Sequence, residues 1–270
     1  MTEAVWRYLE EAWGNDIYPH GDLGGFVVEH WPDPERAAGD LAAGWIEVKL
    51  AEEDEVDWLQ FLRGASKWCA LGRLPAFLPL IRQVLGAGLL AIGAPAVVFL
   101  SRRFGESNDL VERAGLAMLI GEFGIAASGA VHLLTTALAE QNPEGDRCSV
   151  RIAAAGALGQ IGAMMDEDDV GGAMAGALET LIRVAGDAGE FQPLRTYCIE
   201  ALMDLGPPAR SAIPLLTRMV RDDAEDEDLR NFAWSALESV EAPSREHPCG
   251  GTVAEHMRSL YGAELYGAEE

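Results

Sequence analysis

Residues 150–162 read VRIAAAGALGQIG, and the fold of the chain follows from this stretch. Its apolar residues recur at every third position: Ile152, Ala155, Leu158 and Ile161. This spacing predicts a helix with a narrow apolar face. Arg151 stands at the front of the helix. Gly162, eleven positions after that arginine, suits a left-handed cap at the end of a helix.

The same frame recurs along the chain. In residues 194–206, LRTYCIEALMDLG, Gly206 again follows an arginine by eleven positions. The arginines that open a frame are Arg82, Arg113, Arg151, Arg195 and Arg230, and the pattern lapses after the last. Second apolar segments, often with a proline near the start, follow the first four frames at 94–104, 128–140, 170–185 and 207–220. Because one helix pair cannot bury its own apolar face, the pattern predicts helix pairs stacked in an array.

The repeated unit resembles the HEAT repeat. The first helix matches at Val150, Arg151, Ala154, Ala157, Leu158, Gly159, Ile161 and Gly162, and the second at Ala209, Ala212, Ile213, Pro214 and Leu215. The resemblance covers residues 82–240, with an extension through 70–81. It implies an all-α fold, a right-handed α-α superhelix whose concave surface is lined by the second helices. It implies no particular chemistry, since such arrays serve many functions.

The N-terminal part differs in composition, because six of the seven tryptophans fall there: Trp6, Trp13, Trp31, Trp45, Trp58 and Trp68. Residues 6–13 and 32–44, the latter closed by Gly44, are predicted helices. WIEVKL at 45–50 alternates apolar and polar residues, as a strand or extended segment would. We expect three parts: a Trp-rich segment, 1–64, that caps the first repeat; the repeat array, 65–262; and an acidic tail, 263–270.

Charge excludes several classes of partner. The chain has 44 acidic and 20 basic residues, a net charge of −24. This balance opposes binding to nucleic acid and to anionic membranes, and it would speed association with a basic protein. The N-terminus lacks the profile of a signal peptide, and the four cysteines are far apart. We therefore expect a cytoplasmic protein.

Acidic residues gather just before the predicted first helices. Equivalent loops of a solenoid line up along one edge, so these runs predict an acidic ridge. The candidate partner-binding residues are Glu52, Glu53, Asp54, Glu55, Asp109, Glu144, Asp146, Asp187, Glu190, Asp222, Asp223, Glu225, Asp226, Glu227 and Asp228. Capping of helix N-termini, together with solubility, is the alternative explanation for them.

Four of the frame arginines follow an acidic residue by four or five positions. The acidic residues are Asp109, Asp146, Glu190 and Asp226, before Arg113, Arg151, Arg195 and Arg230 respectively. In one array these residues are expected to form a ladder of arginine–carboxylate contacts between units. Contact of the arginines with a carboxylate ligand is the alternative.

Catalytic and metal-binding motifs are absent from the sequence. It has no GxSxG, CxxC or HExxH motif and no glycine-rich loop that fits a phosphate. The DEDD run at 166–169 lacks the spaced oxygens and turning glycine of a calcium loop, and His247, Cys249 and His256 lack a zinc-site spacing. We expect no catalytic residue, no cofactor and no metal.

Three functional hypotheses follow. The first is a non-catalytic HEAT-repeat protein that binds a basic protein partner through the acidic ridge and the concave face. Its sharpest form is an immunity protein or antitoxin that neutralises a toxin. The second is a scaffold or regulatory adaptor whose partner is not especially basic. The third is an enzyme on a HEAT-type array, such as a bilin lyase or a DNA glycosylase.

Overall fold

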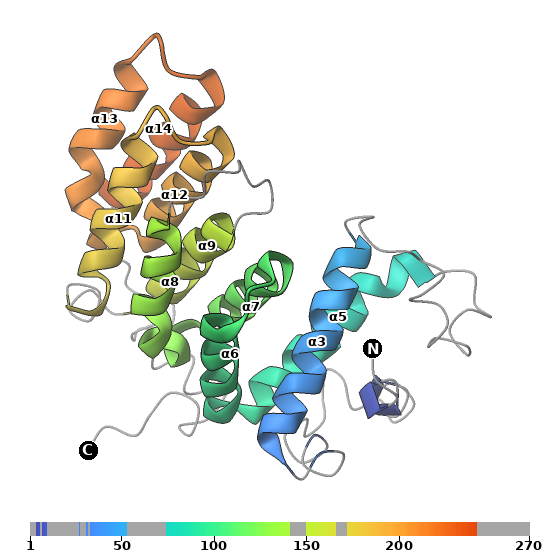
Figure 1. The fold of residues 1–270 in the computed structure, drawn as a ribbon. Coiled ribbons are helices and arrows are strands. Elements are labelled where there is room, and N and C mark those ends of the chain that lie inside the picture. Colours follow the sequence, from blue (N-terminus) through green and yellow to red (C-terminus); the bar gives the residue numbers. More distant parts are fainter. Residues whose placement is uncertain are drawn as a thin grey trace, which may run out of the picture. The chain divides into compact units, whose positions relative to one another are not determined.

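The computed structural model describes residues 4–5, 7–9, 27, 31, 33–52, 74–140, 150–165 and 172–241. Within these ranges every regular element is helical (Figure 1). None of these helices is by itself both long and apolar enough to cross a membrane. The chain divides into two compact units, Met1–Phe104 and Gly105–Glu270. The predicted domain boundaries, the DEDD run and the histidines of the rejected zinc site lie outside the described residues.

The first unit is built on α3 (Pro34–Glu52), α5 (Leu74–Ile92) and the greater part of α6 (Ala94–Glu106). α3 packs along α5. It also meets α6, because a Cβ placed on Gly39 would lie 3.2 Å from the ring of Phe99. α3 therefore covers both helices of the first Arg-led frame.

The course of α3 corrects the sequence-based prediction for this segment. The helix continues through Gly44, and residues 45–50 are helical rather than extended. Leu41, Trp45 and Val48 stand at helical spacing and are fully buried. The alternation in WIEVKL is thus the edge of a helical face, and the burial of Trp45 outweighs the β-propensity of so short a run.

N-terminal aromatic residues cover α5 within the first unit. The Tyr8 hydroxyl donates a hydrogen bond to the Val84 carbonyl at 3.4 Å, and burial raises the pKa of Tyr8. A Cβ on Gly88 would lie 2.6 Å from that hydroxyl, so the glycine makes room for it. The rings of Tyr8 and Trp31 lie 5.5 Å apart.

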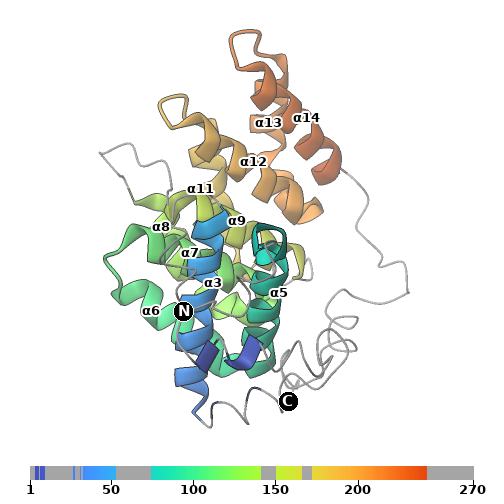
Figure 2. The same cartoon turned by 90° about the vertical axis from the view of Figure 1, so that its right-hand side faces the viewer.

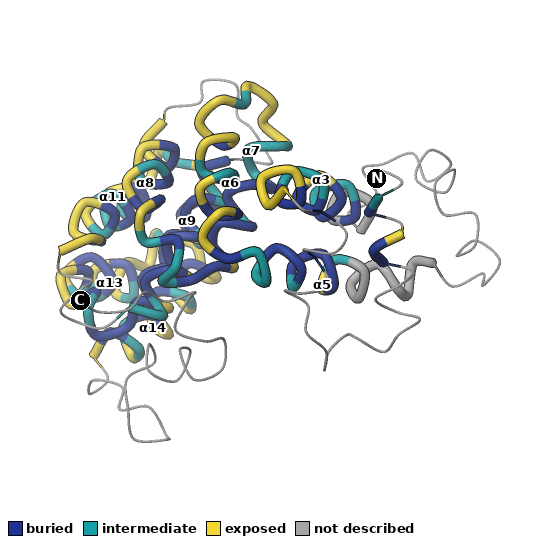
Figure 3. Tube along the Cα trace, turned by 90° about the horizontal axis from the view of Figure 1, so that it is seen from below, coloured by how far each residue is buried: buried dark blue, intermediate teal, exposed yellow. Residues whose placement is uncertain are grey.

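The second unit is a stack of helix pairs, as predicted. Its first helices are α7 (Leu110–Glu122), α9 (Val150–Ala163), α12 (Gln192–Leu205) and α14 (Glu227–Glu241). Its second helices are α8 (Val131–Ala139) after η2 (Gly124–Ala130), α11 (Ala175–Gly186), and α13 (Ile213–Arg221) after η3 (Pro207–Ala212). Successive first helices pack together, and each second helix packs on the first helix that follows it (Figures 1 and 2). α9 is buried along most of its length (Figure 3).

Glycine and alanine set the distance between first helices. A Cβ on Gly121 would lie 2.8 Å from the Cα of Ala157, and one on Gly159 would lie 2.9 Å from the Cα of Ala201. Both glycines stand eight positions after their frame arginine, and both alanines stand six positions after theirs. The same small-residue contact therefore recurs from α7 to α9 and from α9 to α12.

The predicted glycine caps are confirmed at three of four frames. Gly93, Gly124 and Gly206 have φ values of 72°, 53° and 63°, the left-handed region that ends a helix. The prediction is wrong at Gly162, because α9 runs one residue past it. A side chain there would collide with Leu205, so this glycine serves packing.

We predict that Gly159→Ala lowers the free energy of unfolding by roughly 1–3 kcal/mol, because its methyl group would meet the backbone of α12. Gly156→Ala is the matched control in the same helix, since nothing lies within 4 Å of a Cβ there. It is expected to raise stability by about 0.5–1 kcal/mol. Urea unfolding followed by circular dichroism measures both, and equal effects of the two changes would contradict the packing.

Candidate functional site

Arg151 joins three elements of the second unit. Its Nε donates to the Leu138 carbonyl at 2.9 Å, near the end of α8. Its two Nη atoms donate to the two carboxylate oxygens of Glu190, at 2.9 and 2.6 Å. Glu190 lies in the loop that precedes α12. One guanidinium at the start of α9 therefore ties the preceding second helix to the following loop.

Arg195 repeats this arrangement one unit later. Its Nε donates to the Ala185 carbonyl at 3.0 Å, and its Nη atoms pair with both carboxylate oxygens of Glu225 at 3.0 and 2.5 Å. The two side chains are 7% and 16% exposed. Ala185 lies in the last turn of α11, where carbonyls lack a partner within the helix. Hydrogen bonding to Arg195 is the main cause that lowers the pKa of Glu225.

The predicted ladder of arginine–carboxylate contacts is therefore confirmed for Arg151 and Arg195, with each carboxylate supplied by the next repeat. The partner of Arg195 is Glu225 rather than Asp226. The ladder weakens toward its ends. Arg113 pairs with Glu140 at 3.1 Å, where the carboxylate is half exposed. Arg230 reaches only Asp223, at 3.5 Å, and that side chain is fully exposed.

Several candidate carboxylates cap helices or close turns. Asp109 accepts hydrogen bonds from two N–H groups at the start of α7, and Asp226 does the same at the start of α14. Asp187 and Asp222 each accept one from the N–H two positions later. Glu227 and Asp228 are exposed in the first turn of α14. Glu52 is the last residue of α3. The remaining candidates lie outside the described residues: Glu53, Asp54, Glu55, Glu144 and Asp146.

The acidic loops of the second unit do follow one edge of the stack. Residues 187–190 and 222–228 precede successive first helices, and the pairs from Arg151 and Arg195 tie these loops to the units before them. Two of their side chains, Glu190 and Glu225, are turned inward as ion pairs, whereas the aspartates that cap helices or close turns remain exposed. Capping, the alternative explanation, accounts for Asp226 in these loops, and turn closure accounts for Asp187 and Asp222.

Four arginines on the second helices of the second unit face solvent instead of forming ion pairs. They are Arg183 on α11, Arg210 on η3, and Arg218 and Arg221 on α13. All four are exposed, and within the described part of the chain none lies within 4 Å of a carboxylate oxygen. The cations of the second unit thus divide into arginines that hold the stack and arginines that face solvent.

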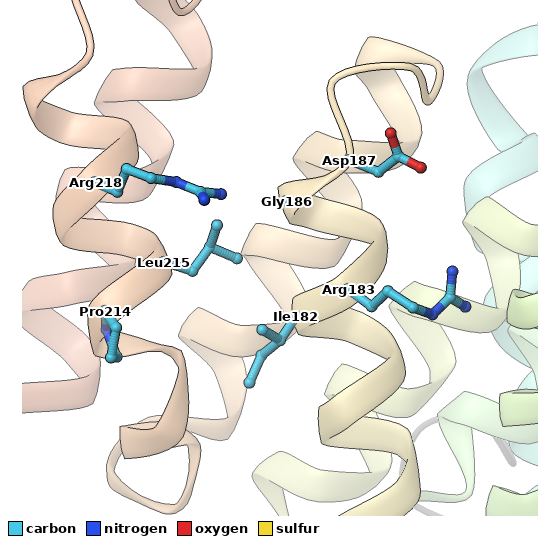
Figure 4. Close-up of a pocket in the computed structure, with 7 residues that line it drawn as sticks. All are labelled: Ile182, Arg183, Gly186, Asp187, Pro214, Leu215 and Arg218. Carbon is cyan, nitrogen blue, oxygen red and sulfur yellow. The ribbon is translucent and has the colours of Figure 1, made fainter.

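A groove lies between two successive second helices, α11 and α13. Its volume is about 500 Å³, and its lining residues are Ile182, Arg183, Gly186, Asp187, Pro214, Leu215 and Arg218. Figure 4 shows Arg218 reaching from α13 toward α11, with Leu215 and Ile182 pointing into the space between the helices. Arg183 extends away from α13 in the same view. The groove therefore offers aliphatic walls with a guanidinium above them.

Local sequence explains this geometry. On α13, Leu215, Leu216 and Met219 form the buried face, which leaves Arg218 on the solvent side. At the end of α11, a Cβ on Gly186 would lie 3.1 Å from Leu215 and 3.5 Å from the Arg218 guanidinium. The glycine thus lets both side chains approach the helix end, whose partial negative charge favours a cation.

Sequence reasoning did not single out this groove. Its residues come from two separate helices, and only Pro214 and Leu215 among them belong to the HEAT-like pattern. One signal was present, because IPLLTRMVR at 213–221 places two arginines on the polar side of a strongly amphipathic helix. The candidate residue Asp187 does lie at the groove, and its carboxylate is engaged by the Gly189 N–H.

Comparison with known proteins gives a structural likeness and no match to a family model or curated protein. Among solved structures, the complex of CpcE and CpcF of phycocyanin lyase from Nostoc sp. PCC7120 is similar, with a TM-score of 0.45 and 25% identity. The match covers 58% of this chain and 89% of that chain.

These findings correct the sequence-based prediction of function. No family model and no curated protein supports an immunity protein or antitoxin. On the described edge, moreover, Glu190 and Glu225 neutralise arginines of the array itself. The hypothesis of an acidic ridge that binds a basic protein is therefore wrong.

We predict that Glu225→Gln lowers the free energy of unfolding by roughly 2–4 kcal/mol, because it leaves the buried Arg195 without a counter-ion. Asp223→Asn is the control in the same loop. Its carboxylate is fully exposed, so stability should not change measurably. Chemical denaturation measures both variants, and a neutral Glu225→Gln would remove the ladder as a source of stability.

The ion pair of Arg195 and Glu225 also predicts that stability depends on pH. The folded-state pKa of Glu225 lies below its ordinary value of 4.5, so its contribution is fully present above pH 4.5. That contribution is lost as the pH falls through the folded-state pKa. Stability measured from pH 7 to pH 3 should therefore fall more steeply in the natural chain than in Glu225→Gln. Parallel curves would contradict the assignment.

Proposed function

We propose that this chain is a binding protein that takes up an acidic segment of a protein partner in the groove between α11 and α13. The observation that carries the proposal is the exposed guanidinium of Arg218 above the aliphatic side chains of Ile182 and Leu215. A carboxylate placed on Arg218 could form a charge-assisted hydrogen bond. Leucine or aromatic side chains of the same segment would bury against the groove walls.

Charge around the groove supports this choice of partner. Arg210 and Arg221 lie on the same or the adjoining element as Arg218, and both are exposed. Carboxylates on the neighbouring elements are Glu179 and Asp187 on or beside α11, and Asp222, Asp223, Glu225 and Asp226 in the loop after α13. Glu225 interacts electrostatically with Arg218, although its hydrogen-bonded partner is Arg195. Hydrogen bonds within their own turns engage Asp187 and Asp222. The charged residues of η3 and α13 themselves, however, are all arginines, and these are the charges that an arriving carboxylate would meet on that wall of the groove.

The net charge of −24 works against an acidic partner only at a distance. At physiological ionic strength, charges farther apart than about 8 Å are largely screened from one another. Contacts at hydrogen-bond distance then decide the affinity, and one hydrogen bond to a charged group contributes about 1.5–3 kcal/mol. Local arginines can outweigh the overall charge.

We also infer that the chain acts by binding rather than by catalysis, that its array belongs to the HEAT family, and that it resides in the cytoplasm. A guanidinium and aliphatic carbons orient a ligand without transferring a proton, because arginine stays protonated. The Arg-led frames support the family. Burial raises the pKa of the Cys198 thiol to about 12, which suits an unreactive cysteine in a reducing compartment.

We predict that a fluorescein-labelled peptide of alternating glutamate and leucine binds the full chain in fluorescence anisotropy. Its counterpart with lysine in place of glutamate should bind at least tenfold more weakly. Arg218→Glu should weaken binding of the acidic peptide by about 10–100-fold, because it replaces the attraction of a charged hydrogen bond with repulsion.

Two further variants control this experiment. Arg218→Gln removes the charge with little change in size and should show an intermediate loss. Arg36→Glu makes the same charge change at an exposed arginine of the first unit and should leave the affinity unchanged. If the acidic peptide binds all four proteins equally, the groove is not its site and the proposed function fails.

A further inference from the structure

Resting on the proposed function, we infer that the groove has an occupant within the chain itself. This occupant is the C-terminal segment 260–270, which competes there with the acidic segment of the partner. Three features support this occupant: the chemistry of the groove, the sequence of the segment, and the place where α14 ends. Together they make the chain self-inhibited in the absence of its partner.

The segment has the composition that the groove requires. Residues 260–264 read LYGAE, residues 265–269 repeat LYGAE, and Glu270 follows. Each copy brings a leucine and a tyrosine for the aliphatic walls and a glutamate for the guanidinium of Arg218. The segment contains no lysine or arginine. It therefore matches the groove in both charge and apolar character.

The segment can reach the groove. The Ser239 hydroxyl, two residues before the end of α14, donates to the Met203 carbonyl at 2.8 Å, just ahead of the turn that leads into η3. α14 thus ends at the edge where η3 and α13 begin, and Pro214 lines the groove at that end. The chain between Glu241 and residue 260 can extend to about 60 Å, whereas α13, with nine residues, is about 14 Å long.

Tethering makes a weak contact effective. Attachment to the same chain gives the segment a local concentration on the order of 1 mM at its site. If the free segment binds with a Kd of about 100 µM, the tethered copy occupies most grooves and weakens a competitor about tenfold. Substituting the glutamates of the tail should therefore strengthen the binding of an added peptide.

The experiment measures binding of a fluorescein-labelled peptide with the sequence of residues 259–270. We expect it to bind about tenfold more tightly to the full chain carrying Glu264→Lys, Glu269→Lys and Glu270→Lys than to the natural chain. The matched control carries Glu106→Lys, Glu238→Lys and Glu241→Lys, exposed glutamates near helix ends. It makes the same change in charge and should bind like the natural chain.

Adding Arg218→Glu to the tail variant should abolish binding of the peptide, which places the contact in the groove. Equal affinity for the natural chain and the tail variant would overturn the inference. The proposed function would then still stand if the alternating glutamate–leucine peptide keeps its dependence on Arg218. Failure of both peptides would overturn both. Dimers in sedimentation that are lost in the tail variant would place the segment in a second copy and overturn the intramolecular contact.

Discussion

A buried guanidinium must have its donors satisfied, and this requirement shapes the second unit. Arg151 and Arg195 meet it with the same set of partners, a carbonyl near the end of the preceding second helix and a carboxylate from the loop of the next repeat. Breaking such a pair leaves an uncompensated charge in a site that water barely reaches. The units that begin with Arg151 and Arg195 are therefore each held to the unit that follows.

The pairing of the buried arginines also explains which charged side chains remain accessible at the surface. The carboxylates closest to the first-helix arginines are neutralised inside the stack, and the aspartates beside them satisfy N–H groups of helices and turns. Asp223, Glu227 and Asp228 remain exposed on this edge. The arginines on α11, η3 and α13 form no ion pair with a described carboxylate, so accessible cations gather on these elements of an overall acidic protein.

The first helices of the stack pack on one another through a different kind of contact from the second helices. First helices meet through Gly121 with Ala157 and through Gly159 with Ala201, where no larger side chain fits. Second helices meet through larger side chains, Leu215 and Arg218 against Gly186. Close approach in one layer and wider spacing in the other leave the groove between α11 and α13. Packing of small residues on one side therefore creates the candidate site on the other.

The sequence by itself determined the helical repeat, the arginine frames and three of the four glycine caps, because these depend on local spacing of 3.6 residues and on φ at one position. Only the tertiary structure decided that residues 45–50 are helical, since burial of Trp45 outweighs local propensity. It alone decided which carboxylates pair inward, and it alone brought Ile182 and Arg218 together. Such contacts join residues far apart in the chain, and no spacing along the sequence encodes their distance.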